Sequence, residues 1–155
     1  ILRRAVKLTD EVMATVVDRI RPGVSQADLR ALIRQEGLRR GAQDVSFPPA
    51  ALFVTAGSDP GPDPFSYPLE KGLIPRTSIA FDFGFVLDGY CSDFGRSVFI
   101  GDPHPEALAA YEAITSGNLA LMPALRDGRI TPAEIADLMR DHVAARGFGD
   151  YYLYE

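Results

Sequence analysis

The stretch of sequence from Ser78 to Phe99 reads SIAFDFGFVLDGYCSDFGRSVF. It contains two strand-like runs on either side of Asp88-Gly89, and an Asp-Gly pair in this setting is one of the strongest local signals for a β-hairpin. If these two residues form the turn, Asp82 lies directly opposite Gly95 on the neighbouring strand. The stretch therefore predicts an antiparallel hairpin with a defined register.

The two faces of this hairpin differ in composition. One face carries large apolar side chains, at Ile79, Phe81, Phe83, Phe85, Leu87, Tyr90, Phe94, Val98 and Ile100. The other carries small residues around two acids, at Ser78, Ala80, Asp82, Gly84, Val86, Cys91, Asp93, Gly95 and Ser97. The first face is expected in the core, because residues two apart on a strand share a face. The second lacks the long polar side chains of an ordinary solvated face.

Asp82 and Asp93 are predicted to be diagonal neighbours on this second face, about 7–8 Å apart at Cα. Two carboxylates held close together repel one another unless a proton or a cation lies between them. One interpretation is a divalent-metal site with room above it for a substrate. The other is a pair of solvated acids beside a turn. The pattern alone leaves both open.

Composition indicates one soluble domain with a real core. The chain has 155 residues, of which 46% are hydrophobic and 24% charged, as in ordinary globular proteins. A net charge of −5 argues against a nucleic-acid surface. No apolar run is long enough to span a membrane. The single cysteine, Cys91, excludes an internal disulfide and favours a reducing, cytoplasmic location.

Helices are predicted on both sides of the hairpin. The other expected elements are an amphipathic helix over 2–20, a second helix ending at Gly41, a strand over 50–55, a loop over 57–68, and helices over 105–126 and 131–147. Ser25 with Asp28, and Thr131 with Glu134, have the spacing of a capping box, in which each residue's side chain binds the other's backbone N–H.

The two predicted helix pairs repeat one pattern. Seven positions lie 105–106 residues before seven matching ones: Gly23, Ser25, Asp28, Leu29, Leu32, Arg34 and Gly41 before Gly128, Thr131, Glu134, Ile135, Leu138, Arg140 and Gly147. A nearly constant offset over so many positions indicates an internal repeat. It predicts a two-fold pseudosymmetric domain, with residues 1–101 as its first half and 102–155 as the helices of a second half whose strands are missing.

The hairpin resembles the metal-binding hairpin of the pita-bread metallopeptidases. The resemblance rests on Asp82, on Asp93 eleven residues later, and on the GYCSDFGR segment. An Ile-x-Pro-Gly turn at 20–23 is similar too, and the match covers 2–155. The superfamily includes methionine aminopeptidase, aminopeptidase P, prolidase and creatinase. The resemblance implies an α+β fold of the pita-bread (creatinase/aminopeptidase) type, truncated after the helices of the second half, and is closest to the Xaa-Pro peptidase branch.

The resemblance also implies a function. It implies a hydrolase of the aminopeptidase P or Xaa-Pro dipeptidase type, which cleaves the N-terminal peptide bond of a peptide substrate. Asp82 and Asp93 are then ligands of two divalent ions, Mn²⁺ or Co²⁺, with an activated water between them; no other catalytic residue is assigned. The alternatives are a methionine aminopeptidase and a non-catalytic binding or scaffold protein. A homodimer also stays open.

The sequence departs from the family pattern in two places. Family members take one His and two Glu from the second half, with the His in a Gly-His-Gly-like segment that does not occur before Glu155. The 155-residue chain alone is therefore expected to be inactive. Phe65 stands at the substrate-binding position where family peptidases carry a His. Phenylalanine cannot hydrogen-bond a substrate carbonyl. Either the loop aligns differently, or this branch works without the histidine, or the protein is not an ordinary aminopeptidase, which favours the scaffold alternative.

Overall fold

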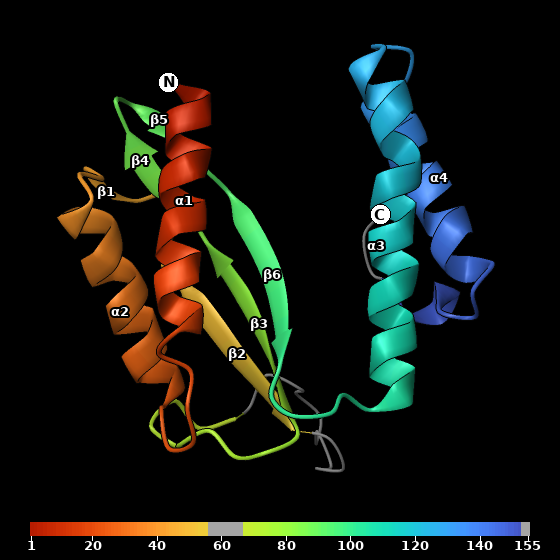
Figure 1. Ribbon diagram of the computed structural model, residues 1–155. Helices are drawn as coiled ribbons and strands as arrows, with labels where there is room; N and C mark the ends of the chain where they lie inside the picture. Colours follow the sequence, from red (N-terminus) through yellow and green to blue (C-terminus); the bar gives the residue numbers. More distant parts are fainter. Residues whose placement is uncertain (56–66, 153–155) are drawn as a thin grey trace. The chain divides into compact units, whose positions relative to one another are not determined.

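A computed structural model describes residues 1–55 and 67–152, which form two units, 1–103 and 104–155 (Figure 1). The first unit contains α1 (Leu2–Val17), α2 (Gln26–Arg39), β1 (Asp44–Val45), β2 (Ala50–Thr55), β3 (Thr77–Phe83), β4 (Phe85–Leu87), β5 (Tyr90–Cys91) and β6 (Phe94–Phe99). The second contains α3 (Pro105–Arg126), α4 (Pro132–Ala144) and the short 3₁₀ helix η1 (Gly149–Tyr151). The predicted loop over 57–68 lies almost wholly outside the described residues.

The first unit is built on two antiparallel sheets. One has the strand order β2-β3-β6, and the other has the order β1-β4-β5. The helices α1 and α2 pack against each other and against the strands, on one side of the sheets (Figure 1). The opposite face of β2-β3-β6 is the one that carries the two acids.

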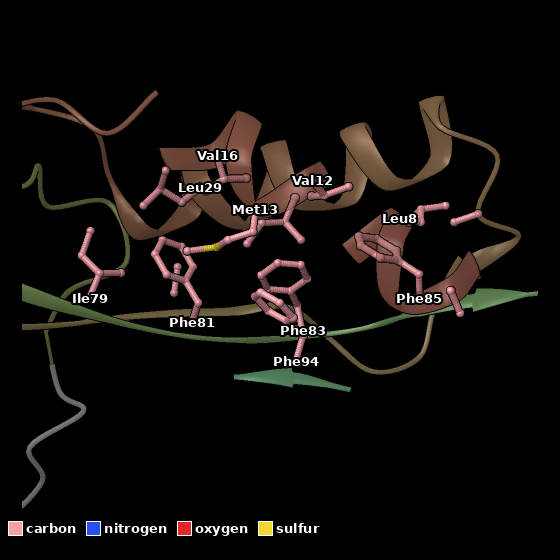
Figure 2. Packing of buried hydrophobic residues seen from close by; sticks show 14 of the residues in the cluster. Leu8, Val12, Met13, Val16, Leu29, Ile79, Phe81, Phe83, Phe85 and Phe94 are labelled. Atoms are coloured by element: carbon pink, nitrogen blue, oxygen red, sulfur yellow. The ribbon is translucent and has the colours of Figure 1, made fainter. Parts of the chain in front are cut away.

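The core lies between the helices and the sheet (Figure 2). Apolar residues of α1 recur at three- and four-residue spacing, so they form one stripe on the helix. Phenylalanines of β3, β4 and β6 meet this stripe from the sheet. Members of the core include Leu8, Val12, Met13, Val16, Leu29, Ile33, Phe53, Ile79, Phe81, Phe83, Phe85 and Phe94. The predicted apolar face of the hairpin is thus confirmed along most of its length.

Tyr90 is the exception, because its side chain is 47% exposed. It was expected in the core by strict alternation along the strand. It belongs to β5, a strand of two residues at the edge of its small sheet and next to the hairpin turn. The end of a hairpin presents less neighbouring surface than its middle, so an aromatic ring there remains half in solvent.

Both predicted capping boxes are present. In α2 the Asp28 N–H donates to Ser25 Oγ at 3.0 Å, and the Ser25 N–H donates to Asp28 Oδ2 at 2.9 Å. In α4 the Glu134 N–H donates to Thr131 Oγ1 at 3.3 Å, and the Thr131 N–H donates to Glu134 Oε2 at 2.8 Å. Each box satisfies backbone N–H groups that the first helical turn leaves without partners.

Ser25→Ala is expected to lower the free energy of unfolding by about 1 kcal/mol, since the alanine cannot accept the Asp28 N–H. Ser25→Thr keeps a hydroxyl at the cap and is expected to lose less. Urea denaturation of the two variants and the wild type measures both values. Equal losses in the two variants would mean that packing around the 4% exposed Ser25, and not the cap, sets the effect.

The contribution of Asp28 is expected to depend on pH. The hydrogen bond from the Ser25 backbone N–H, and then that from the Ser25 hydroxyl, holds the pKa of the Asp28 carboxyl below its usual range. As the pH falls, the Asp28 carboxyl therefore takes up its proton in the unfolded chain before it does so in the folded protein. The stabilisation present at neutral pH is lost as the pH falls through and below the usual range of an aspartate pKa. The difference in unfolding free energy between wild type and Asp28→Ala should shrink on acidification; a constant difference would contradict this.

The second unit is a pair of packed helices. Leu121, Met139 and Val143 are buried between α3 and α4, with Phe148 partly buried beside them. A Cβ at Gly117 would lie 2.7 Å from Met139 Sδ, so the absence of a side chain there allows the helices to approach closely. None of the described helices is long and apolar enough to cross a membrane.

Candidate metal centre

The hairpin turn forms where the sequence predicts it. Leu87 pairs with Tyr90, and Asp88 and Gly89 have φ values of 52° and 78°. Two successive left-handed residues match the twist of the flanking strands, as in a type I′ turn. The Arg4 guanidinium contacts Asp88 Oδ2 at 3.0 Å, which joins the turn to the start of α1.

The hairpin changes sheets halfway along its length. β3 belongs to one sheet and β4 to the other, and Gly84 is the single residue between them. The pairs β3–β6 and β4–β5 keep the same register across this break. No residue is inserted, so Gly84 lies opposite Asp93, as predicted. The break therefore divides the hairpin between two sheets without moving any side chain to the other face.

The register brings the two predicted metal ligands to one face. Asp82 pairs directly with Gly95, and Asp93 precedes Gly95 by two residues. Diagonal neighbours of this kind lie about 7–8 Å apart at Cα. Both aspartates are exposed, while Phe81 and Phe83 beside Asp82 are buried on the other face. The structure thus places the two aspartates on one face; their role as ligands stays a prediction.

The direct neighbours of Asp82 across the sheet are both small. Ala50 of β2 pairs with it on one side and Gly95 of β6 on the other. Along its own strand the next residue on the same face is Ala80. The carboxylate therefore projects from the sheet without a long side chain beside it in these positions, as the composition of the face predicted.

The carboxylates of Asp82 and Asp93 could supply part of the ligand set of a hard divalent cation. Carboxylate oxygens are ligands that Mg²⁺ and Mn²⁺ prefer, and Asp82 and Asp93 supply two such groups. Among residues 1–55 and 67–152, no group of three His, Cys, Asp or Glu residues could hold a metal ion. Within the described chain, the two aspartates would therefore form only part of a ligand set.

The other polar or aromatic positions of interest lie outside the described residues or in the second unit. Phe65 and Glu155 lie outside the described residues. His104 caps α3, where its Nδ1 accepts the Glu106 N–H at 3.3 Å. His142 Nε2 lies 2.9 Å from Ser116 Oγ, between α3 and α4. Both histidines belong to the second unit.

Sequence reasoning missed a buried polar group next to the centre. Ser92 is 6% exposed, and its hydroxyl lies 2.7 Å from Thr9 Oγ1 of α1. A signal was available, because Ser92 falls at a core-face position between Tyr90 and Phe94. A polar side chain at such a position needs a hydrogen-bond partner, although the sequence does not show which one.

Comparison with known proteins identifies a family model, a relative in sequence and relatives in structure. Residues 1–154 match the model of metallopeptidase family M24. The chain is 31% identical over 155 residues to YkvY of Bacillus subtilis (strain 168), which is provisionally named a dipeptidase, covering 98% of this chain and 40% of YkvY. Among solved structures, a prolidase from Thermococcus sibiricus is 25% identical, with a TM-score of 0.81, over 99% of this chain and 41% of that one. Dipeptidase PepE from Mycobacterium ulcerans is 26% identical, with a TM-score of 0.81, over 99% and 40%.

These matches confirm the predicted α+β pita-bread fold and the likeness to the branch that contains the prolidases. The chain spans about 40% of the length of these relatives. The family match covers the aspartate pair together with the helices on both sides of the hairpin. The chain belongs to metallopeptidase family M24.

Proposed function

We propose that the complete protein is a metal-dependent peptidase that hydrolyses the N-terminal peptide bond of Xaa-Pro substrates. The observation that carries the proposal is the placement of Asp82 and Asp93 on one exposed sheet face, between small neighbours. Membership of a metallopeptidase family supports the use of divalent ions. The likeness to a prolidase supports the choice of an Xaa-Pro bond.

Each part of the face has a role in this proposal. Asp82 and Asp93 would hold two divalent ions, Mn²⁺ or Co²⁺. Ions bound there supply Lewis acidity toward the carbonyl of the scissile bond. Ala50 and Gly95 leave the space beside Asp82 open to a peptide backbone. The buried phenylalanines on the opposite side keep β3 rigid beneath the carboxylates.

Removal of metal tests the proposal. The complete protein is expected to release proline from an Ala-Pro dipeptide, to lose this activity after dialysis against EDTA, and to regain it with Mn²⁺ or Co²⁺. Proline release is followed over time, with Met-Ala as the competing substrate. Full activity after EDTA treatment would contradict metal dependence, and faster cleavage of Met-Ala would favour a methionine aminopeptidase. The isolated 155-residue chain is expected to show no turnover.

A second candidate is a non-catalytic binding or scaffold protein. It is favoured by Phe65, if this residue occupies the position at which the family resemblance implies a substrate-contacting histidine. A phenyl ring offers neither a donor nor an acceptor to a substrate. In this case the complete protein would bind Mn²⁺ but cleave neither dipeptide, and Phe65→His would not create activity.

A further inference from the structure

We propose that Ser92, Thr9 and Ser46 are positioning residues for Asp93, because together they fix the backbone from which its carboxylate projects. This inference rests on the proposed function, in which Asp93 binds metal. None of the three side chains needs to touch a metal or a substrate. They act on the peptide that joins Ser92 to Asp93.

The hydroxyl of Ser92 is part of a directed chain of hydrogen bonds. The Phe85 N–H donates to Ser92 Oγ at 3.0 Å, and Thr9 Oγ1 donates to the Ala5 carbonyl at 2.9 Å. A hydroxyl has one proton to donate, and that of Thr9 goes to the Ala5 carbonyl. We therefore assign the 2.7 Å contact between the two hydroxyls as a hydrogen bond from Ser92 to Thr9. The chain joins β4 to α1 through buried groups that all have partners.

The carbonyl of Ser92 is thereby freed from the strand ladder. In a regular antiparallel pair Phe85 and Ser92 would exchange two backbone hydrogen bonds. Only one is present, from the Ser92 N–H to the Phe85 carbonyl at 2.9 Å. The Phe85 N–H goes to the Ser92 hydroxyl instead, and the Ser92 carbonyl accepts from Ser46 Oγ at 3.0 Å. This carbonyl belongs to the peptide bond that leads into Asp93.

Ser46 holds both strands at the point where the sheets separate. Besides binding the Ser92 carbonyl, its N–H donates to the Gly84 carbonyl at 3.0 Å. Gly84 lies opposite Asp93, and a Cβ there would stand 1.9 Å from the Ser92 carbonyl oxygen. The peptide entering Asp93 is therefore held by Ser46 and by the bare Gly84 backbone, which both lie close to the Ser92 carbonyl oxygen.

Loss of the Ser92–Thr9 contact allows a different hydrogen-bond pattern between Ser92 and Phe85. The buried Ser92 hydroxyl then turns to the Phe85 carbonyl, 3.4 Å away, and the Phe85 N–H can bind the Ser92 carbonyl as in a regular ladder. That change rotates the Ser92–Asp93 peptide and moves the carboxylate. Groups that hydrogen-bond a metal ligand directly typically contribute roughly 10–100-fold to metal affinity, and residues that fix the ligand's backbone are expected to act at the lower end of that range.

Calorimetric titration of the complete protein with MnCl₂ tests the proposal. Thr9→Val removes the hydroxyl but nearly keeps the shape, and is expected to weaken Mn²⁺ binding by about tenfold with unchanged stoichiometry. Thr9→Ser restores a hydroxyl and is expected to recover most of that affinity. Ser46→Ala, which removes the hydrogen bond to the Ser92 carbonyl, is expected to weaken binding as Thr9→Val does, and serves if Thr9→Val does not fold.

Val12→Ala is the matched control for stability. Val12 is fully buried one turn further along α1, so this variant should lower the Tm without changing Mn²⁺ affinity. Wild-type affinity in both Thr9→Val and Ser46→Ala, or affinity that follows the Tm across all variants, would overturn the positioning role alone. Absence of Mn²⁺ binding by the wild type would overturn the proposed function and the positioning role together.

Discussion

Asp82→Asn is expected to lower the number of Mn²⁺ ions bound by the complete protein and to reduce hydrolysis of Ala-Pro far more than a positioning variant does. Asparagine keeps the size of the side chain between Ala50 and Gly95 but removes the negative charge. Removal of a partner outside the ligand set typically costs up to roughly 100-fold, and loss of a ligand itself should exceed that. Proline release and calorimetry measure the two effects.

In the metal-free protein, Asp82→Asn should leave the thermal stability unchanged or raise it. Without a cation the carboxylates of Asp82 and Asp93 repel one another across the sheet face. Asp82→Asn removes this repulsion, so the metal-free variant is expected to unfold at the same or a higher temperature than the metal-free wild type. A clear loss of thermal stability in the variant would indicate a structural role for the carboxylate.

Asp10→Asn is the charge control for this experiment. Asp10 is exposed on α1, on the side of the unit away from the aspartate pair. Asp10→Asn changes the net charge of the protein by the same amount as Asp82→Asn. It should leave both the Mn²⁺ stoichiometry and the hydrolysis of Ala-Pro unchanged. Equal stoichiometry in Asp82→Asn and wild type would exclude Asp82 as a ligand.

The hairpin and the aspartate pair were predictable because their signals are local. A two-residue Asp-Gly turn fixes the register of both strands, and the register alone decides that Asp82 and Asp93 share a face. The capping boxes were predictable for the same reason, since Ser25 and Asp28 are three residues apart. None of these features depends on a distant part of the chain.

The support beneath Asp93 was not predictable, because it depends on contacts between distant residues. Thr9 and Ser92 are separated by 83 positions, and Ser46 and Ser92 by 46. Strand alternation also gave no sign that the hairpin divides between two sheets at Gly84. The strands divide where the hydroxyls of Ser92 and Ser46 replace the backbone hydrogen bond from the Phe85 N–H to the Ser92 carbonyl. Only the packed structure defines these contacts.

The first helix was predicted three residues too long. Its apolar spacing continues to Ile20, but α1 ends at Val17. Pro22 disfavours a helical conformation at the residue before it, and Gly23 has a φ of 89°. After Val17 the chain forms a tight turn instead, in which the Arg19 and Ile20 N–H groups donate to the Val16 and Val17 carbonyls at 3.0 and 3.1 Å. The Gly23 N–H then donates to the Leu73 carbonyl at 3.0 Å, which ties the segment to a distant part of the chain.

Gly84→Ala is expected to destabilise the protein strongly, by about 3 kcal/mol or more, as overpacking of a close contact does. The added Cβ would stand 1.9 Å from the Ser92 carbonyl oxygen and 2.4 Å from Ser46 Oγ. The serine hydroxyl can rotate away, but the carbonyl is part of the backbone and can move only with the strand. Gly84 is not among the described glycines with positive φ, so lack of space, and not backbone strain, causes the loss.

Gly95→Ala is the matched control, because it makes the same substitution on the same sheet face. The nearest atom to a Cβ at Gly95 is the Phe81 carbonyl oxygen at 3.9 Å, an ordinary contact, and alanine reduces the freedom of the unfolded chain. Urea denaturation should therefore show wild-type or slightly higher stability for Gly95→Ala. If Gly84→Ala were equally stable, the strands would have room to separate at Gly84. The peptide entering Asp93 would then not be held in place, which would also remove the structural basis for the positioning of its carboxylate.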